Sequence, residues 1–179
     1  MPKIVDHDQR RSELLDKCLG VFLEKGYAAV TTRELERVTG VSTGILYHYF
    51  ESKEDLFSRL VRSFVEKVTL ELADAVVRGQ NPAERLALVM QYIDSKEPEL
   101  NSYLLILTDY ARCVGFEKFR KELDFAQAES ALLELLSVAL EMSREQASKT
   151  LTYVMGFLII RFLTGKNSSL VNEVSVVIA

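Results

Sequence analysis

Between Thr31 and Asp55 the sequence concentrates side chains that donate hydrogen bonds or carry positive charge. The stretch reads TTRELERVTGVSTGILYHYFESKED, and its hydroxyl, guanidinium, imidazole and ammonium groups suit phosphate oxygens and the edges of base pairs. Arg33 can reach a guanine through two hydrogen bonds, Thr43 can contact a thymine methyl, and Gly44 lets the backbone approach closely. We therefore expect recognition of a nucleic-acid duplex at this stretch.

Two short helices joined by a tight turn must position these side chains. Thr31 and Glu34 form a capping box, which predicts a helix that begins there and ends at Gly40, a residue suited to the left-handed conformation at a helix end. Ser42 then caps a second short helix that runs to Phe50. This arrangement is a helix-turn-helix, whose second helix enters the major groove of DNA.

The polarity pattern assigns an inner and an outer side to this motif. The apolar residues that two crossed helices would share are Leu35, Val41, Leu46 and either Tyr49 or Phe50. The residues left facing outward are Thr32, Arg33, Thr43, Gly44, Tyr47 and His48. A third helix, capped by Ser52 and beginning at Lys53, places a lysine at a helix N-terminus, which is a site for a backbone phosphate.

At these residues the chain resembles the TetR family of bacterial repressors. The resemblance is carried by TGILYHYF at residues 43–50, followed by Lys53 and Leu56, and the close match covers about residues 11–60. It implies phosphate contacts from Thr32, Ser42, Tyr47, Tyr49 and Lys53. It implies base-edge contacts from Arg33, Thr43, Gly44 and His48, although His48 could also be a solvated surface residue.

Two positions depart from the family pattern. Glu36 and Thr39 stand where the family usually has alanine at the crossing of the two helices. We expect the long Glu36 side chain to turn its carboxylate outward, toward Arg33 or Arg37.

Helical spacing of apolar residues predicts an all-α fold of about nine helices. Residues 1–7 are expected to form a tail. Domains are expected at 1–55, which binds DNA, and at 56–179, which binds a ligand and dimerises. Outside the motif the predicted helices span about Arg10–Lys25, Lys53–Arg78, Ala83–Ser95, Pro98 to Gly115, Glu117–Glu141, Ser143–Leu163 and, despite a valine-rich composition, Ser169–Ala179.

Composition and charge narrow the class of protein. The chain has 179 residues, of which 48% are hydrophobic and 27% charged, so it can form a real core and is not a disordered chain. Residues 1–53 carry eight basic and eight acidic residues, which predicts modest non-specific affinity for DNA. Cys18, expected in the core, and Cys113 lie far apart, and no signal peptide is expected, so a reduced, cytoplasmic protein is predicted. The apolar run at 151–163 is too short for a membrane span.

A second copy of the chain is expected for geometric reasons. The predicted recognition helix at 43–50 is about 12 Å long, which covers little more than three base pairs. A twofold homodimer would place two such helices in successive major grooves of a near-palindromic operator. The resemblance implies dimerisation through the last two helices, whose apolar residues could alternatively be internal core.

The remaining helices suggest a domain that responds to a small, largely apolar effector. The candidate lining residues are Tyr103, Leu107, Tyr110, Phe116, Tyr153 and Phe157, each of which could equally be ordinary core. Asp109, Arg112 and Arg161 could meet a polar end of a ligand or be solvated or salt-bridged charges. We expect no cofactor and no metal site. A ligand that favours one helix arrangement would swing the helix that begins at Lys53 and weaken operator binding.

Two other functions compete with this interpretation. An enzyme is disfavoured because the two histidines provide no metal cluster or catalytic triad, and no glycine-rich phosphate loop is present. A helical ligand-binding or protein-interaction module that no longer reads DNA stays open, because of the neutral N-terminal charge and Glu36. The sequence does not indicate the effector, the operator, or whether the protein represses or activates.

Overall fold

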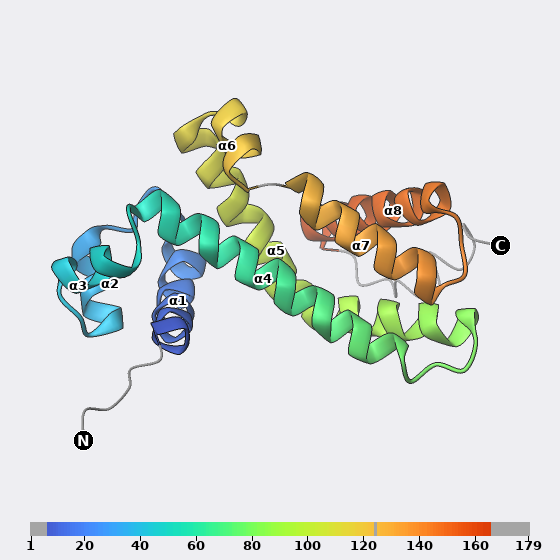
Figure 1. Ribbon diagram of the computed structural model, residues 1–179. Coiled ribbons are helices and arrows are strands. Elements are labelled where there is room, and N and C mark those ends of the chain that lie inside the picture. Colours follow the sequence, from blue (N-terminus) through green and yellow to red (C-terminus); the bar gives the residue numbers. More distant parts are fainter. Residues whose placement is uncertain (1–6, 124, 166–179) are drawn as a thin grey trace, which may run out of the picture. The chain divides into compact units, whose positions relative to one another are not determined.

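The computed structural model describes residues 7–123 and 125–165, and these residues are helical apart from short turns (Figure 1). The described helices are α1 (His7–Lys25), α2 (Thr32–Thr39), α3 (Thr43–Tyr49), α4 (Lys53–Val76), α5 (Pro82–Val114), α6 (Phe116–Leu123), α7 (Phe125–Ala139) and α8 (Arg144–Thr164). The prediction of an all-α chain is confirmed, with eight helices in the described residues. None of the described helices is both long and apolar enough to span a membrane.

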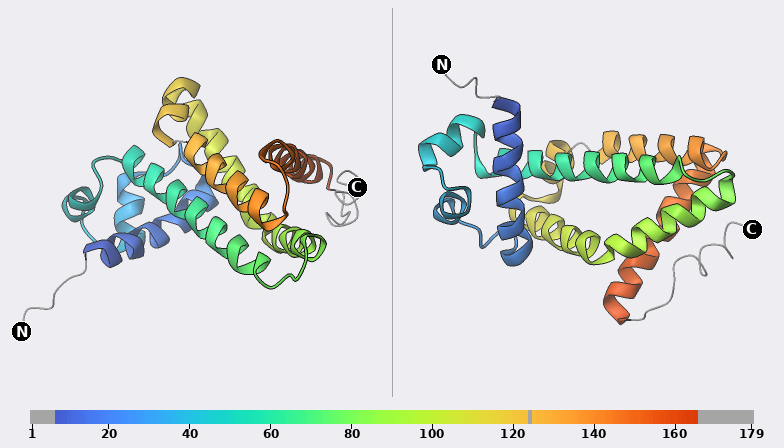
Figure 2. Two further views of the ribbon diagram at one scale, coloured as in Figure 1. Left: turned by 45° about the vertical axis from the view of Figure 1, so that its right-hand side comes forward. Right: turned by 90° about the horizontal axis from the view of Figure 1, so that it is seen from below.

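The helices are distributed over two compact units. Unit 1 contains residues 1–64 and 103–123, and unit 2 contains residues 65–102 and 124–179. Helices α4 and α5 each contribute to both units, and Figure 2 shows α4 as one continuous helix. Whether 1–55 and 56–179 behave as separate domains stays a prediction.

Unit 1 is built around an aromatic cluster. The ring of Tyr110 lies 4.6 Å from that of Tyr27 and 4.7 Å from that of Phe57, and Phe22 lies 5.3 Å from Phe57 (distances between ring centroids). These four rings come from α1, the turn after it, α4 and the C-terminal half of α5. All four are buried, so α1, α4 and α5 share one aromatic core in unit 1.

Unit 2 has a separate aliphatic core. Helices α7 and α8 lie side by side (Figure 1) and pack with the second half of α4 and the first half of α5. The buried residues of this core are Leu72, Val76, Val89, Met90, Ile93, Leu133, Leu136, Ala139, Leu140, Ala147, Val154 and Leu158.

The prediction that Pro98 begins a new helix is wrong, because α5 continues through it from Pro82 to Val114. Proline removes one backbone hydrogen bond within a helix. Here its ring lies at the exposed surface, while Ile93 and Leu100 on either side pack against the same core. Packing on both flanks therefore outweighs the local cost, and two predicted helices become one.

Other boundaries differ less. Helix α1 begins at His7, three residues before the predicted start. The predicted helix at 117–141 is described as α6 and α7, on either side of residue 124, which lies outside the described residues. The predicted last helix at 169–179 also lies outside them.

Candidate nucleic-acid interface

The two helices of the motif are capped as the sequence predicts. The Thr31 hydroxyl accepts the Glu34 N–H at 3.3 Å, and the Glu34 carboxylate accepts the Thr31 N–H at 2.9 Å. Gly40 ends α2 in the left-handed conformation, with φ of 72°. Ser42 caps α3 by accepting the Ile45 N–H. The sharp corner between α2 and α3 is therefore fixed by local hydrogen bonds.

The capping box is tied to α1 by an ion pair. The Lys25 ammonium contacts the Glu34 carboxylate, and this contact, with the hydrogen bonds from Thr31, lowers the pKa of Glu34 to about 2. Lys17 donates to the Thr39 carbonyl at 3.3 Å, so α1 also holds the other end of α2. Both ends of α2 are thus fixed to α1.

The inner side of the motif matches the predicted set closely. Leu35, Leu46 and Phe50 are buried, whereas Val41 and Tyr49 are only partly covered. Of the two residues offered for the last core position, Phe50 occupies it. Thr39 is also buried and donates its hydroxyl to the Leu35 carbonyl at 2.6 Å, which satisfies a polar group in the place of an alanine.

Five of the nine predicted DNA contacts are exposed. Arg33, Ser42, Gly44, Tyr47 and His48 are exposed. The remaining candidates, Thr32, Thr43, Tyr49 and Lys53, are partly covered. Their contacts with DNA stay predictions.

Two of the hydroxyls predicted to bind phosphate lie together. The Thr32 hydroxyl and the Tyr47 hydroxyl are 3.5 Å apart, although they come from different helices. A phosphate placed beside the two hydroxyls could accept a hydrogen bond from each, because its oxygens have several lone pairs.

Glu36 does not turn outward as the sequence predicts. Its carboxylate accepts the backbone N–H of Thr43 at 2.5 Å and also the Thr43 hydroxyl. The first turn of α3 has free backbone N–H groups, and the corner at Gly40 brings Glu36 within reach of them. These hydrogen bonds, with a smaller contribution from the charge of Arg33, hold the pKa of the Glu36 carboxyl below its usual value.

His7 is a further neighbour of the recognition helix that sequence reasoning placed in the tail. Its ring lies 6.4 Å from that of His48 and 6.0 Å from that of Tyr49, between centroids. The two histidines of the chain therefore lie near each other at this surface. Predicting this contact would have required knowing that α1 begins at His7. The spacing of apolar residues does not indicate where that helix begins. Among the described residues, no group of three or more potential metal ligands comes together.

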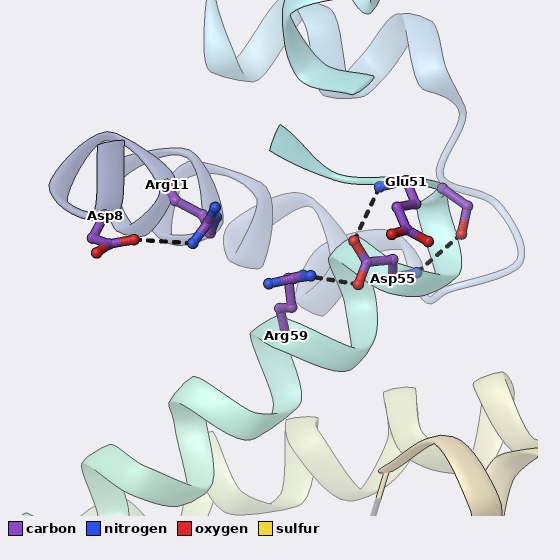
Figure 3. Close-up of polar contacts among 6 residues, drawn as sticks. Asp8, Arg11, Glu51, Asp55 and Arg59 are labelled. Carbon is purple, nitrogen blue, oxygen red and sulfur yellow. Dashed lines mark hydrogen bonds and ion pairs between the residues drawn. The ribbon is translucent and has the colours of Figure 1, made fainter. Parts of the chain in front are cut away.

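Lys53 has an aromatic partner. Its ammonium lies 4.3 Å from the centroid of the Tyr27 ring, a cation–π contact, and partial burial lowers the pKa of Lys53. The helix that it begins is capped by Ser52, which accepts the Asp55 N–H at 3.1 Å. Figure 3 shows the Asp55 carboxylate between the Glu51 N–H and the Arg59 side chain, at 3.0 and 2.8 Å.

The six candidates for an effector site fall in both units. Tyr103, Leu107, Tyr110 and Phe116 belong to unit 1, and Tyr153 and Phe157 belong to unit 2. Tyr103 and Tyr110 are buried, whereas Phe116 and Tyr153 are 61% and 54% exposed. Tyr110 is part of the aromatic cluster, and its hydroxyl donates to Glu122. A role for these six in binding a ligand stays a prediction.

The three charges noted beside them have different environments. Asp109 accepts the Ala28 N–H at 2.8 Å in unit 1. Arg161 is salt-bridged in unit 2, where its side chain is only 10% exposed and contacts Asp94 at 2.7 Å as well as Glu97. Arg112 is exposed.

Comparison with known proteins agrees with this geometry. Residues 14–60 match the family model described as bacterial regulatory proteins, tetR family. This range covers most of α1, the whole helix-turn-helix and the start of α4. The matched family consists of regulators rather than enzymes.

Individual relatives match part of the chain. The transcriptional regulator PksA of Bacillus subtilis is 30% identical over 115 residues, which is 63% of this chain and 56% of that protein. The transcriptional repressor KstR2 of Mycobacterium tuberculosis is 38% identical over 79 residues, which is 44% of this chain and 40% of that protein. The chain thus spans about half the length of the curated relatives it matches. The solved structure of reduced NemR from E. coli has the same fold, with a TM-score of 0.75 at 20% identity over 94% of this chain and 95% of that one.

Proposed function

Because the chain belongs to the TetR family of bacterial regulatory proteins, we propose that it is a DNA-binding transcriptional repressor. It would occupy a near-palindromic operator as a homodimer and leave it when a small, largely apolar effector binds. It would act in the cytoplasm, where the DNA of a bacterium lies.

One observation carries the DNA-binding part of this proposal. Five of the nine residues suited to DNA, Arg33, Ser42, Gly44, Tyr47 and His48, are exposed on or beside a pair of capped helices. Arg33, His48 and the open backbone at Gly44 would meet base edges, while Thr32, Ser42, Tyr47, Tyr49 and Lys53 would meet phosphates. To contact a phosphate, the Lys53 ammonium would either leave the Tyr27 ring or bind the phosphate while it stays over that ring.

The homodimer is supported by the outer face of α8. Large apolar side chains are exposed there at helical spacing, including Tyr153, Ile160 and Leu163, with Gly156 between them. Monomeric proteins rarely expose so continuous an apolar stripe. A second copy of α8 would cover it, and we propose this as the centre of the dimer interface. The predicted partner helix at 169–179 lies outside the described residues.

The response to an effector would travel along the two helices that contribute to both units. Helix α4 leads directly from the motif, and α5 carries Asp109 and Tyr110 into the core of unit 1. An effector that prefers one arrangement of these helices would change the spacing of the two recognition helices in a dimer. A coupling of about 1–3 kcal/mol is enough to change operator affinity roughly 5- to 150-fold.

Two observations favour a second function. The Glu36 carboxylate lies at the edge of the recognition helix, and residues 1–53 carry no net charge. Both weaken attraction to phosphate. The alternative is a helical ligand-binding or protein-interaction module that no longer reads DNA.

A selection of bound sequences from a random DNA pool tests these alternatives. A repressor dimer should enrich a palindromic sequence with half-sites one helical turn or more apart. Binding to that sequence should persist at about 150 mM salt, whereas scrambled DNA should be released. Enrichment of no sequence would favour the module, and a single non-repeated half-site would remove the dimer from the proposal.

A further inference from the structure

The contact between Glu36 and Thr43 determines what Thr43 can offer to DNA. One carboxylate oxygen, Oε1 of Glu36, accepts both the backbone N–H and the hydroxyl of Thr43. A threonine hydroxyl has a single proton, and here it is donated within the protein. Thr43 therefore has no side-chain donor left for a base or a phosphate.

The same contact also fixes the rotamer of Thr43. Threonine is branched at Cβ, so placing Oγ1 toward Glu36 fixes the direction of the methyl group as well. The backbone N–H bond to the same oxygen prevents the first turn of α3 from sliding along α2. The methyl becomes the part of Thr43 with which the helix can contact a base edge, and the thymine methyl is its apolar counterpart in the major groove.

We propose that Glu36 is a positioning residue that makes Thr43 a reader of the 5-methyl group of thymine. This inference rests on the proposed DNA-binding function and names one base in each half-site. The carboxylate has an opposing effect, because a negative charge at this edge repels phosphates. Glu36 thus lowers the affinity for DNA in general while it raises the preference for thymine over uracil. Replacing a residue with a purely structural role would not change these two quantities in opposite directions.

The experiment replaces single thymines of the selected operator by deoxyuridine, which removes only the methyl group. Dissociation constants are measured with the full-length protein at fixed salt. We expect one thymine in each half-site at which the wild-type protein loses about fourfold in affinity, the value of burying one carbon, and about 16-fold when both half-sites are changed.

Four variants assign this effect to the two residues. Glu36→Ala should bind the thymine operator as tightly as wild type or more tightly, but should lose the thymine preference. Glu36→Gln keeps an acceptor oxygen without the charge and should retain the preference. Thr43→Ser keeps both hydrogen bonds and removes the methyl, so the preference should vanish. Thr43→Val keeps a methyl and should retain part of the preference.

The outcomes separate this inference from the function on which it rests. If the wild-type protein selects no DNA sequence, the proposed function fails. If it selects a sequence that contains no uracil-sensitive thymine, or if Glu36→Ala keeps the full preference, this inference alone is overturned. If Glu36→Ala does not fold, as judged by circular dichroism, Thr43→Ser decides: an unchanged preference in that variant overturns the inference.

Discussion

The carboxylate of Asp109 accepts a hydrogen bond from the backbone N–H of Ala28 at 2.8 Å, across 81 positions of the sequence. The acceptor lies on α5, and the donor lies in the turn between α1 and α2. This contact fastens the C-terminal half of α5 to the segment that leads into the helix-turn-helix. It lies within unit 1, beside the packing of Tyr110 on Tyr27, and makes α5 part of the support of the recognition helix.

Replacing Asp109 by alanine should destabilise unit 1 by about 1 kcal/mol, the net value of one such hydrogen bond. The loss would be measured by urea unfolding followed by circular dichroism. Asp74→Ala, which removes an exposed acid of α4, is the matched control and should change stability by less than about 0.5 kcal/mol. Equal effects of the two variants would contradict a specific role for Asp109.

Gly26 should not tolerate a side chain. Its φ is 78°, and a Cβ there would lie 3.1 Å from a carboxylate oxygen of Asp109. Gly26→Ala should cost about 1–2 kcal/mol from the left-handed conformation alone. Gly20→Ala is the control, because Gly20 lies within α1 with no atom near its Cβ position, and should stabilise the protein by up to about 1 kcal/mol. Thermal unfolding of the two variants measures the difference. If the midpoints of Gly26→Ala and Gly20→Ala shift in the same direction relative to wild type, the prediction is contradicted.

Glu34 should make stability depend on pH. Its pKa is lowered from 4.5 to about 2 in the folded protein, so the folded state holds this proton less tightly than the unfolded chain. Its stabilising contribution is therefore present above pH 4.5 and lost as the pH falls toward 2. The stability difference between wild type and Glu34→Gln should shrink between pH 6 and pH 3. A difference between wild type and Glu34→Gln that stays constant over this pH range would refute the assignment.

A charge on the outer face of α8 should separate the proposed dimer. Ile160→Glu would place two unpaired carboxylates near the twofold axis, which should weaken dimerisation on the order of 100-fold. Sedimentation velocity would show monomers at micromolar concentration, and operator affinity would fall with them. Val77→Glu alters a residue that is 82% exposed outside α8 and should leave both unchanged. If Ile160→Glu still forms a stable dimer, the dimer interface does not include this face of α8.

The sequence by itself determined the elements whose signals are local. The capping box at Thr31 and the stop at Gly40 depend on residues within one turn of each other, so they could be predicted without knowing the rest of the fold. The same holds for the exposed positions of α3, because helical periodicity separates Leu46 from Tyr47 and His48.

Only the tertiary structure decided relationships between residues on different helices. It carried α5 through Pro98, because packing on both sides of the proline outweighs the lost backbone hydrogen bond. It also brought Tyr110 into the aromatic cluster of unit 1. It also directed Glu36 to Thr43 and Asp109 to Ala28. Such partners are chosen by the crossing of helices, where burial and hydrogen bonding act between distant segments, and no spacing along one helix records that choice.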